Sequence, residues 1–128
     1  MRMKLWLAVG IVATSSHAVD AQSFKTAGGL MKNCADETGA MGGQNYYICL
    51  GYIAGVADGE ATAARRFQSA HGTMSPATCI PEGFVPLQIR ERVVAYLEAH
   101  PEEAGTNAAD VITDLFQQIY PCAGSAAR

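Results

Sequence analysis

The sequence contains few of the side chains from which catalytic and metal sites are built. Its 128 residues include only three histidines, and no GxSxG motif, CxxC motif or zinc-ligand spacing accompanies them. The central glycine repeat follows no predicted strand and lacks the Lys-Ser/Thr ending of a phosphate-binding loop. We therefore predict a protein that is not an enzyme and that holds no cofactor and no metal.

The chain also lacks an apolar run of the ~20 residues that span a bilayer. A basic start is followed by a short apolar stretch, residues 5–13, and then by small and polar residues. This pattern is typical of a Sec-type signal peptide, with cleavage after Ala18 or after Ala21, of which we prefer Ala21. We expect residues 1–21 to be removed and the mature protein to reside in the periplasm without a membrane anchor.

Basic side chains are in the minority. The chain has nine Lys and Arg against 12 Asp and Glu, and removal of Arg2, Lys4 and Asp20 with the signal peptide leaves 7 against 11. This balance argues against nucleic acid or an anionic membrane as the partner, and it is compatible with a basic protein partner. We expect residues 22–122 to form one small domain and residues 123–128 to form a disordered tail.

No segment of useful length alternates with period two, and apolar residues recur instead at helical spacing. The pattern predicts helices over residues 26–36, 44–69, 85–100 and 107–120, with a link or a short helical turn at 101–106. Asn107 resembles a cap for the last helix. The predicted fold class is therefore all-α, a small four- to five-helix bundle.

Four cysteines remain in the mature chain, an even number that is typical of a disulfide framework in a small exported domain. Cys34 closes the first predicted helix and Cys49 opens the second, so antiparallel neighbours would bring them together. Cys79 precedes the third helix and Cys122 follows the fourth, and these meet on the same reasoning. We predict the bridges Cys34–Cys49 and Cys79–Cys122, which staple the bundle.

A glycine stripe runs along the second predicted helix, with Gly51, Gly55 and Gly59 at intervals of four. Three glycines on one helix face suggest the close approach of another backbone. This neighbour belongs either to the same chain or to a second copy in a dimer. Asp58, within the same stretch, is either a buried hydrogen-bonding anchor or an exposed charge.

The segment after this helix contains Gly and Pro and no apolar periodicity, so we predict a surface loop over residues 71–78. Loops of this kind often display binding residues.

The stretches FKTAGGLMKNC, CLGYIAGVADG, CIPEGFVPLQIRERVVAYLEAHPEEAG and AADVITDLFQQIYPC together resemble the Rap/Tai family of immunity proteins. These proteins protect bacteria against peptidoglycan amidases that type VI secretion delivers. The resemblance extends over nearly the whole mature chain, and it depends on the combination of CxGYxxGxxD, CxP, LxxHP and the final PC.

The resemblance implies a periplasmic, disulfide-bonded helical protein, often dimeric, that binds a cognate amidase and occludes its active site. Besides the four cysteines, the motif residues that it marks as structural are Gly51, Tyr52, Gly55 and Asp58, and Gly59 continues their stripe. The resemblance does not identify residues that contact the toxin. We place these in the loop, at Ser69, His71, Thr73, Met74, Ser75 and Thr78, with the link at 101–106 as second choice.

A periplasmic stress protein or acid-activated chaperone without a dedicated toxin partner is the alternative, because such proteins are also small, helical and disulfide-bonded. It predicts many unfolded clients at low pH, whereas the immunity hypothesis predicts one tight partner.

Overall fold

The computed structural model describes residues 25–36, 43–72 and 78–123, and the elements of this part of the chain are helices. In chain order they are α1 (Ala27–Cys34), α2 (Gln44–His71), α3 (Pro86–Ala99), the 3-10 helix η1 (Pro101–Gly105) and α4 (Ala108–Ile119). The all-α prediction is confirmed, and each predicted helix end lies within two residues of the observed one. The predicted signal peptide and nearly all of the predicted tail lie outside the described residues.

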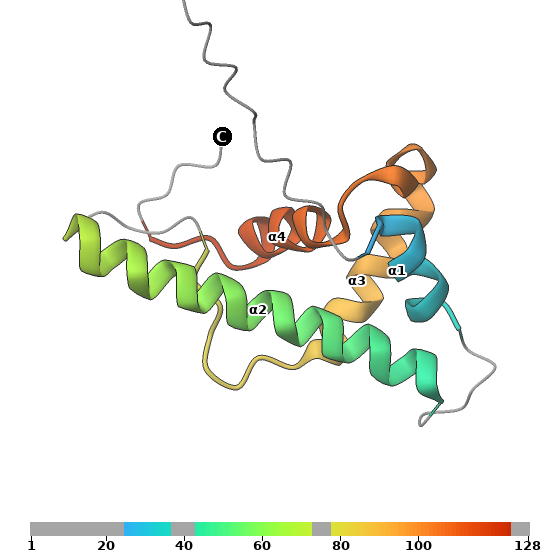
Figure 1. The fold of residues 1–128 in the computed structure, drawn as a ribbon, viewed down its shortest axis with the longest axis horizontal. Helices are drawn as coiled ribbons and strands as arrows, with labels where there is room; N and C mark the ends of the chain where they lie inside the picture. The colour runs from blue at the N-terminus through green and yellow to red at the C-terminus, as the bar shows by residue number, and fades with distance from the viewer. Residues whose placement is uncertain (1–24, 37–42, 73–77, 124–128) are drawn as a thin grey trace, which may run out of the picture.

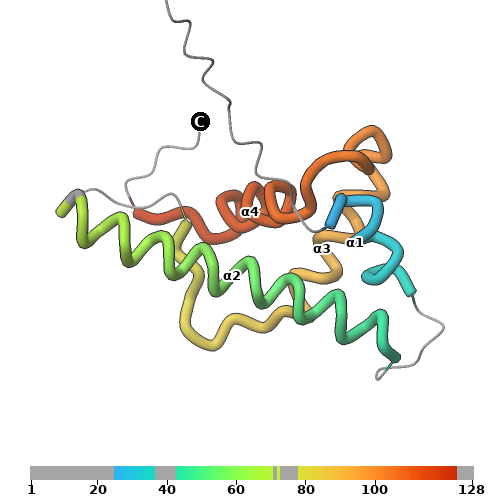
Figure 2. Tube along the Cα trace, viewed as in Figure 1, coloured from blue at the N-terminus to red at the C-terminus, as the bar shows by residue number. Residues whose placement is uncertain are grey.

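The long helix α2 extends along the length of the molecule, and the other helices pack along one side of it (Figure 1). The Cα trace in Figure 2 shows the N-terminal half of α2 near α1 and α3, and its middle beside α4. Cys49, Ile53 and Ala57 form its buried stripe at intervals of four residues. A hydrogen bond of 3.0 Å from the Thr113 hydroxyl to the Glu60 carboxylate joins α4 to α2.

The helices α1 and α4 begin side by side. The Thr26 hydroxyl caps α1 by accepting from the Gly29 amide, and the Asn107 side chain caps α4 by accepting from the Ala109 amide at 2.8 Å. An isolated bridge joins Thr26 to Asn107, with the Ala27 amide donating to the Thr106 carbonyl at 2.8 Å. Residues about eighty positions apart in sequence are thus held together at the N-terminal ends of both helices. The predicted cap at Asn107 is confirmed.

One glycine is required by the packing of η1 against α1. A Cβ atom added at Gly28 would lie 3.1 Å from the carbonyl oxygen of Ala104 and 3.2 Å from its Cβ atom. Both distances are shorter than ordinary van der Waals contact, and the oxygen belongs to the backbone, which cannot rotate away. The absence of a side chain at Gly28 therefore allows η1 to lie directly on α1.

The core lies where the four α-helices meet. Its largest fully buried side chains are Phe116, Leu30, Ile53, Ile89, Ile112 and Val93. The rings of Phe84 and Phe116 meet edge to face with centroids 5.6 Å apart. Phe84 precedes α3, so the segment between Cys79 and α3 also packs against the core.

Both predicted disulfides are present, Cys34–Cys49 between α1 and α2 and Cys79–Cys122 between the segments that precede α3 and follow α4. Next to the first bridge, the Asn33 side chain donates to Asn45 at 2.8 Å, and this contact continues the attachment of α1 to α2. The bridges therefore fasten the two ends of the bundle, as the helix order predicts.

None of the helices in the described ranges combines the length and the apolar character needed to cross a bilayer.

Candidate functional site

The predicted partner-binding residues lie at the C-terminal end of α2 and beyond it. The helix continues two residues further than predicted, to His71, and Ser69 lies exposed on its last turn. The Ser69 hydroxyl donates to the Arg65 carbonyl at 2.9 Å, a bond within the helix. Thr73, Met74 and Ser75 lie outside the described residues, as does the side chain of His71, so the loop that they form stays a prediction.

Thr78 is the exception in that set, because its side chain is buried with 6% of its surface exposed. It forms an isolated bridge with Pro121, and the adjacent Cys79 amide donates to the Tyr120 carbonyl at 2.8 Å. With the bridge to Cys122, these contacts fix the far end of the loop to the end of α4. Thr78 therefore anchors the loop and offers no side-chain surface to a partner.

The glycine stripe of α2 does not pack against its own chain. Gly51, Gly55 and Gly59 are exposed, and Cβ atoms added to them would meet no atom within 4 Å among the described residues. Of the two expected neighbours, one from the same chain is not found at these positions among the described residues, and the close approach within the chain occurs at Gly28. Asp58 is also exposed, which excludes the buried-anchor alternative.

Two large apolar side chains flank this stripe on the exposed face of α2. Tyr47 keeps 63% of its surface exposed and Ile48 keeps 37%. They precede Gly51 by four and three residues, so all three share one face of the helix. Tyr52, the neighbouring motif residue, instead turns toward the core, where burial and then the charge of Asp110 raise the pKa of its phenol.

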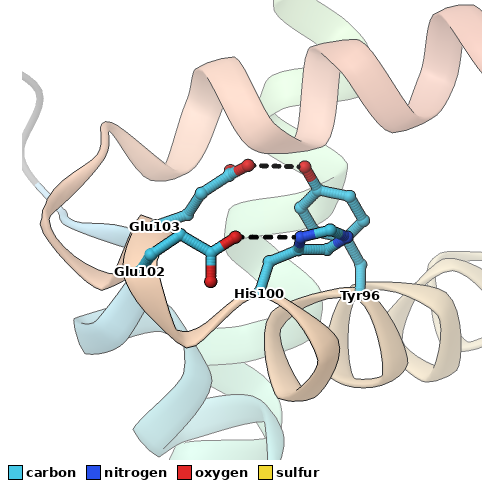
Figure 3. A network of polar contacts seen from close by, with 4 residues as sticks. All are labelled: Tyr96, His100, Glu102 and Glu103. Atoms are coloured by element: carbon cyan, nitrogen blue, oxygen red, sulfur yellow. Dashed lines mark hydrogen bonds and ion pairs between the residues drawn. The ribbon is translucent and has the colours of Figure 1, made fainter.

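A polar cluster forms where α3 ends and η1 begins (Figure 3). His100 is the C-cap of α3, its amide donates to the Tyr96 carbonyl at 3.0 Å, and Pro101 then opens η1. The imidazole of His100 stacks on the ring of Tyr96, with centroids 4.4 Å apart. The LxxHP motif thus ends one helix and starts the next, which agrees with the predicted place of His100 at a helix C-terminus.

The side chains of η1 reach back to α3. The Tyr96 hydroxyl donates to Glu103 Oε1 at 2.7 Å, and His100 Nδ1 lies 3.1 Å from Glu102 Oε1. The bond to Glu103 raises the pKa of Tyr96, because the hydrogen bond is lost when the phenol ionises. A backbone hydrogen bond and then the contact with His100 lower the pKa of Glu102. We call Tyr96, His100, Glu102 and Glu103 the α3–η1 cluster.

In the sequence, His100 ends the helix predicted over residues 85–100, and Glu102 and Glu103 fall in the predicted link at 101–106, with no pattern that connects the three. The available signal is the spacing of four residues between Tyr96 and His100, since residues at this spacing meet on a helix. The contact with Glu103 depends on how η1 turns back over α3, which no local pattern in the sequence specifies.

An open pocket of about 200 Å³ lies beside this cluster, between α1, the end of α3 and η1. Its lining is mostly apolar and consists of Ala27, Gly28, Met31, Leu97, His100, Pro101 and Ala104. The imidazole of His100 is the only titratable side chain in this lining, so the pocket and the α3–η1 cluster share one residue.

Comparison with protein-family models matches residues 26–122 to the family described as Rap1a immunity proteins. The matched range begins at the cap of α1 and ends at the cysteine that closes the second disulfide. Comparisons with curated proteins and with solved structures found no match. The resemblance carried by CxGYxxGxxD, CxP, LxxHP and the final PC is thereby confirmed, and the chain belongs to the Rap1a family of immunity proteins.

Proposed function

We propose that this chain is a periplasmic immunity protein that binds a peptidoglycan amidase toxin delivered by type VI secretion and occludes its active site. The observation that carries the proposal is the family match over residues 26–122, which covers most of the chain. Immunity by occlusion needs a rigid, complementary surface and no reaction on the part of the inhibitor.

The two disulfides support the periplasmic part of the proposal. Such bridges persist in oxidising compartments and are rare where thiols are kept reduced. They close loops with sequence separations of 15 and 43 residues, worth roughly 3 and 4 kcal/mol in the chain-entropy model. The signal peptide predicted over residues 1–21 belongs to the same proposal.

We place the toxin-binding surface at the C-terminal end of α2 and in the loop that follows. Ser69 is exposed there, and His71, Thr73, Met74 and Ser75 continue the segment. The disulfide Cys79–Cys122 and the contacts of Thr78 support this placement, because they hold the far end of the loop and so reduce the entropy that binding would cost.

A homodimer is the second part of the proposal. The exposed face of α2 would receive the second copy, since the glycine stripe lets another helix approach closely and Tyr47 and Ile48 offer apolar area beside it. Sedimentation velocity of the mature protein tests this part independently of the toxin.

The test of immunity is co-expression. The mature protein is exported together with each amidase-like protein from the same genome, and lysis is measured. We expect one amidase to be neutralised, and the purified pair to bind with a 1:1 ratio of chains. Ser69→Arg should weaken this binding at least tenfold, whereas Gln88→Arg, an equal charge change at an exposed position of α3, should leave it unchanged.

Two results would contradict the proposal. If no amidase of the genome is bound or neutralised, the immunity function fails for this chain. If the protein instead protects many unfolded proteins from aggregation at low pH, the chaperone alternative replaces it. Equal loss of binding in both arginine variants would refute only the placement of the surface.

A further inference from the structure

We propose that the α3–η1 cluster binds a divalent transition-metal ion, zinc in preference to others, through the side chains of His100, Glu102 and Glu103. Each of these side chains offers one ligand atom, and the three atoms lie within 4.8 Å of one another. The site goes beyond toxin binding and is independent of it.

The local fold brings the three ligands together. His100 is fixed at the end of α3 by its backbone bond to Tyr96, and Pro101 restricts the backbone as the chain enters η1. The tight turn of the 3-10 helix then returns Glu102 toward the imidazole, while Glu103 turns toward the adjacent Tyr96 hydroxyl (Figure 3).

The ligand chemistry favours zinc. Zinc takes imidazole nitrogen and carboxylate oxygen at about 2.0–2.2 Å, and a tetrahedral arrangement at these lengths places neighbouring ligand atoms about 3.3 Å apart. His100 Nδ1 and Glu102 Oε1 already lie 3.1 Å apart. An imidazole among the ligands selects zinc, nickel or copper over calcium and magnesium, which prefer oxygen alone.

Tyr96 supplies an outer contact of the kind that orients metal ligands. Its hydroxyl donates to Glu103 Oε1, which leaves Oε2 of that carboxylate for the ion. Binding would require the Glu103 side chain to rotate, because the ligand atoms are separated by up to 4.8 Å, and water would complete the fourth position, as in three-ligand zinc sites. The two carboxylates supply two negative charges, which match the charge of the ion.

The site is open to solvent, since the side chains of His100 and Glu102 keep 43% and 68% of their surface exposed. The ion can therefore enter from solvent without any movement of the helices. Exposure also lets water compete for the ion, so we expect weaker binding than at a closed structural zinc site.

The test titrates zinc sulfate into the metal-free mature protein by isothermal calorimetry in a buffer that does not chelate zinc. We expect one ion per chain. His100→Gln and Glu102→Gln should each weaken binding at least tenfold. His71→Gln is the matched control, because it removes the other histidine of the mature chain, and Glu82→Gln removes an exposed carboxylate outside the cluster.

Nuclear magnetic resonance follows the histidine ring signals of the wild-type protein during zinc addition, and it needs no variant to fold. Zinc should shift the ring signals of His100 in proportion to occupancy and leave those of His71 in place. No heat and no shift at 1 mM zinc, or binding that His100→Gln leaves unchanged, would overturn the proposal. Neither outcome bears on toxin binding, because the amidase test is run without added metal.

Discussion

The contrast between Gly28 and Gly55 gives the sharpest test of the packing described above. Both are helical glycines, and alanine at either position gains helix propensity, worth up to about 1 kcal/mol in a helix interior and less in the first turn. At Gly55 a new Cβ atom meets nothing within 4 Å, whereas at Gly28 it would meet the backbone of Ala104 at 3.1 Å. The same substitution should therefore change stability in opposite directions.

We expect Gly55→Ala to raise the free energy of unfolding of the monomer, measured at the lower protein concentration, by about 0.5–1 kcal/mol. For a domain of this size that corresponds to an increase of about 2–8 °C in Tm. At Gly28, overpacking costs about 1–3 kcal/mol and exceeds the propensity gain, so Gly28→Ala should lower the free energy of unfolding. The two variants should differ by about 1–3 kcal/mol.

Urea and thermal unfolding of the mature protein, followed by circular dichroism at two protein concentrations a factor of ten apart, measures both variants. The reasoning is refuted if Gly28→Ala is as stable as Gly55→Ala. Loss of stability in Gly55→Ala at both concentrations would mean that a part of the chain covers the stripe. Loss only at the higher concentration would mean that a second copy covers it, as the proposed dimer requires.

Two further predictions concern the staples and the α3–η1 cluster. Replacing Cys79 and Cys122 together by serine should lower the free energy of unfolding by about 4 kcal/mol, compared with about 3 kcal/mol for removal of the Cys34–Cys49 bridge. Urea unfolding under oxidising conditions measures both double variants. Equal losses, or a larger loss for Cys34–Cys49, would contradict the dependence on loop length. The phenol of Tyr96 should ionise above the ordinary range of tyrosine because of its bond to Glu103. This raised pKa contributes stability that is fully present below pH 10 and is lost as the pH rises through the folded value. A carbon-13 titration measures the pKa in the wild type and in Glu103→Ala, which removes the acceptor, and an unchanged pKa in the variant would show that the bond is not its cause.

The parts of the fold that depend on local pattern could be predicted from the sequence. Apolar residues at helical spacing gave the helices, Asn107 gave a cap, and the order of the helices gave both disulfides. The packing around the glycines could not be predicted from local pattern. Spacing indicated which face of α2 lacks side chains, but whether another backbone lies there depends on how distant segments pack, and the required close approach occurs at Gly28.

The exposure of the residues predicted to bind a partner also depends on packing between distant segments. Composition marked residues 71–78 as a loop, yet Thr78 is buried because the bridge to Pro121 and the neighbouring disulfide draw it against the end of α4. The α3–η1 cluster, conversely, is built from residues that seemed unrelated in sequence. A turn of a single 3-10 helix brings their side chains together, and the direction of that turn is fixed by its packing on α1.

Most of the motif residues that carry the family resemblance have a structural task within this chain. Cys79 and Cys122 form a bridge, Leu97 is buried, and the His-Pro pair ends α3 and starts η1. These parts of the pattern therefore specify the scaffold, and toxin specificity has to reside elsewhere.

The motif CxGYxxGxxD contains both residues that face the core and residues that face solvent. Cys49 and Tyr52 turn toward the core, whereas Gly51, Gly55 and Asp58 face solvent and contact no other part of the described chain closely enough to require their identity. A motif residue without a task inside the protein is best explained by a contact outside it. If the proposed dimer forms through this face, Gly55→Leu should leave the far-UV spectrum and monomer stability intact while abolishing the self-association of the wild type in sedimentation velocity. A variant that remains dimeric would show that the glycines of α2 serve neither the fold nor the assembly.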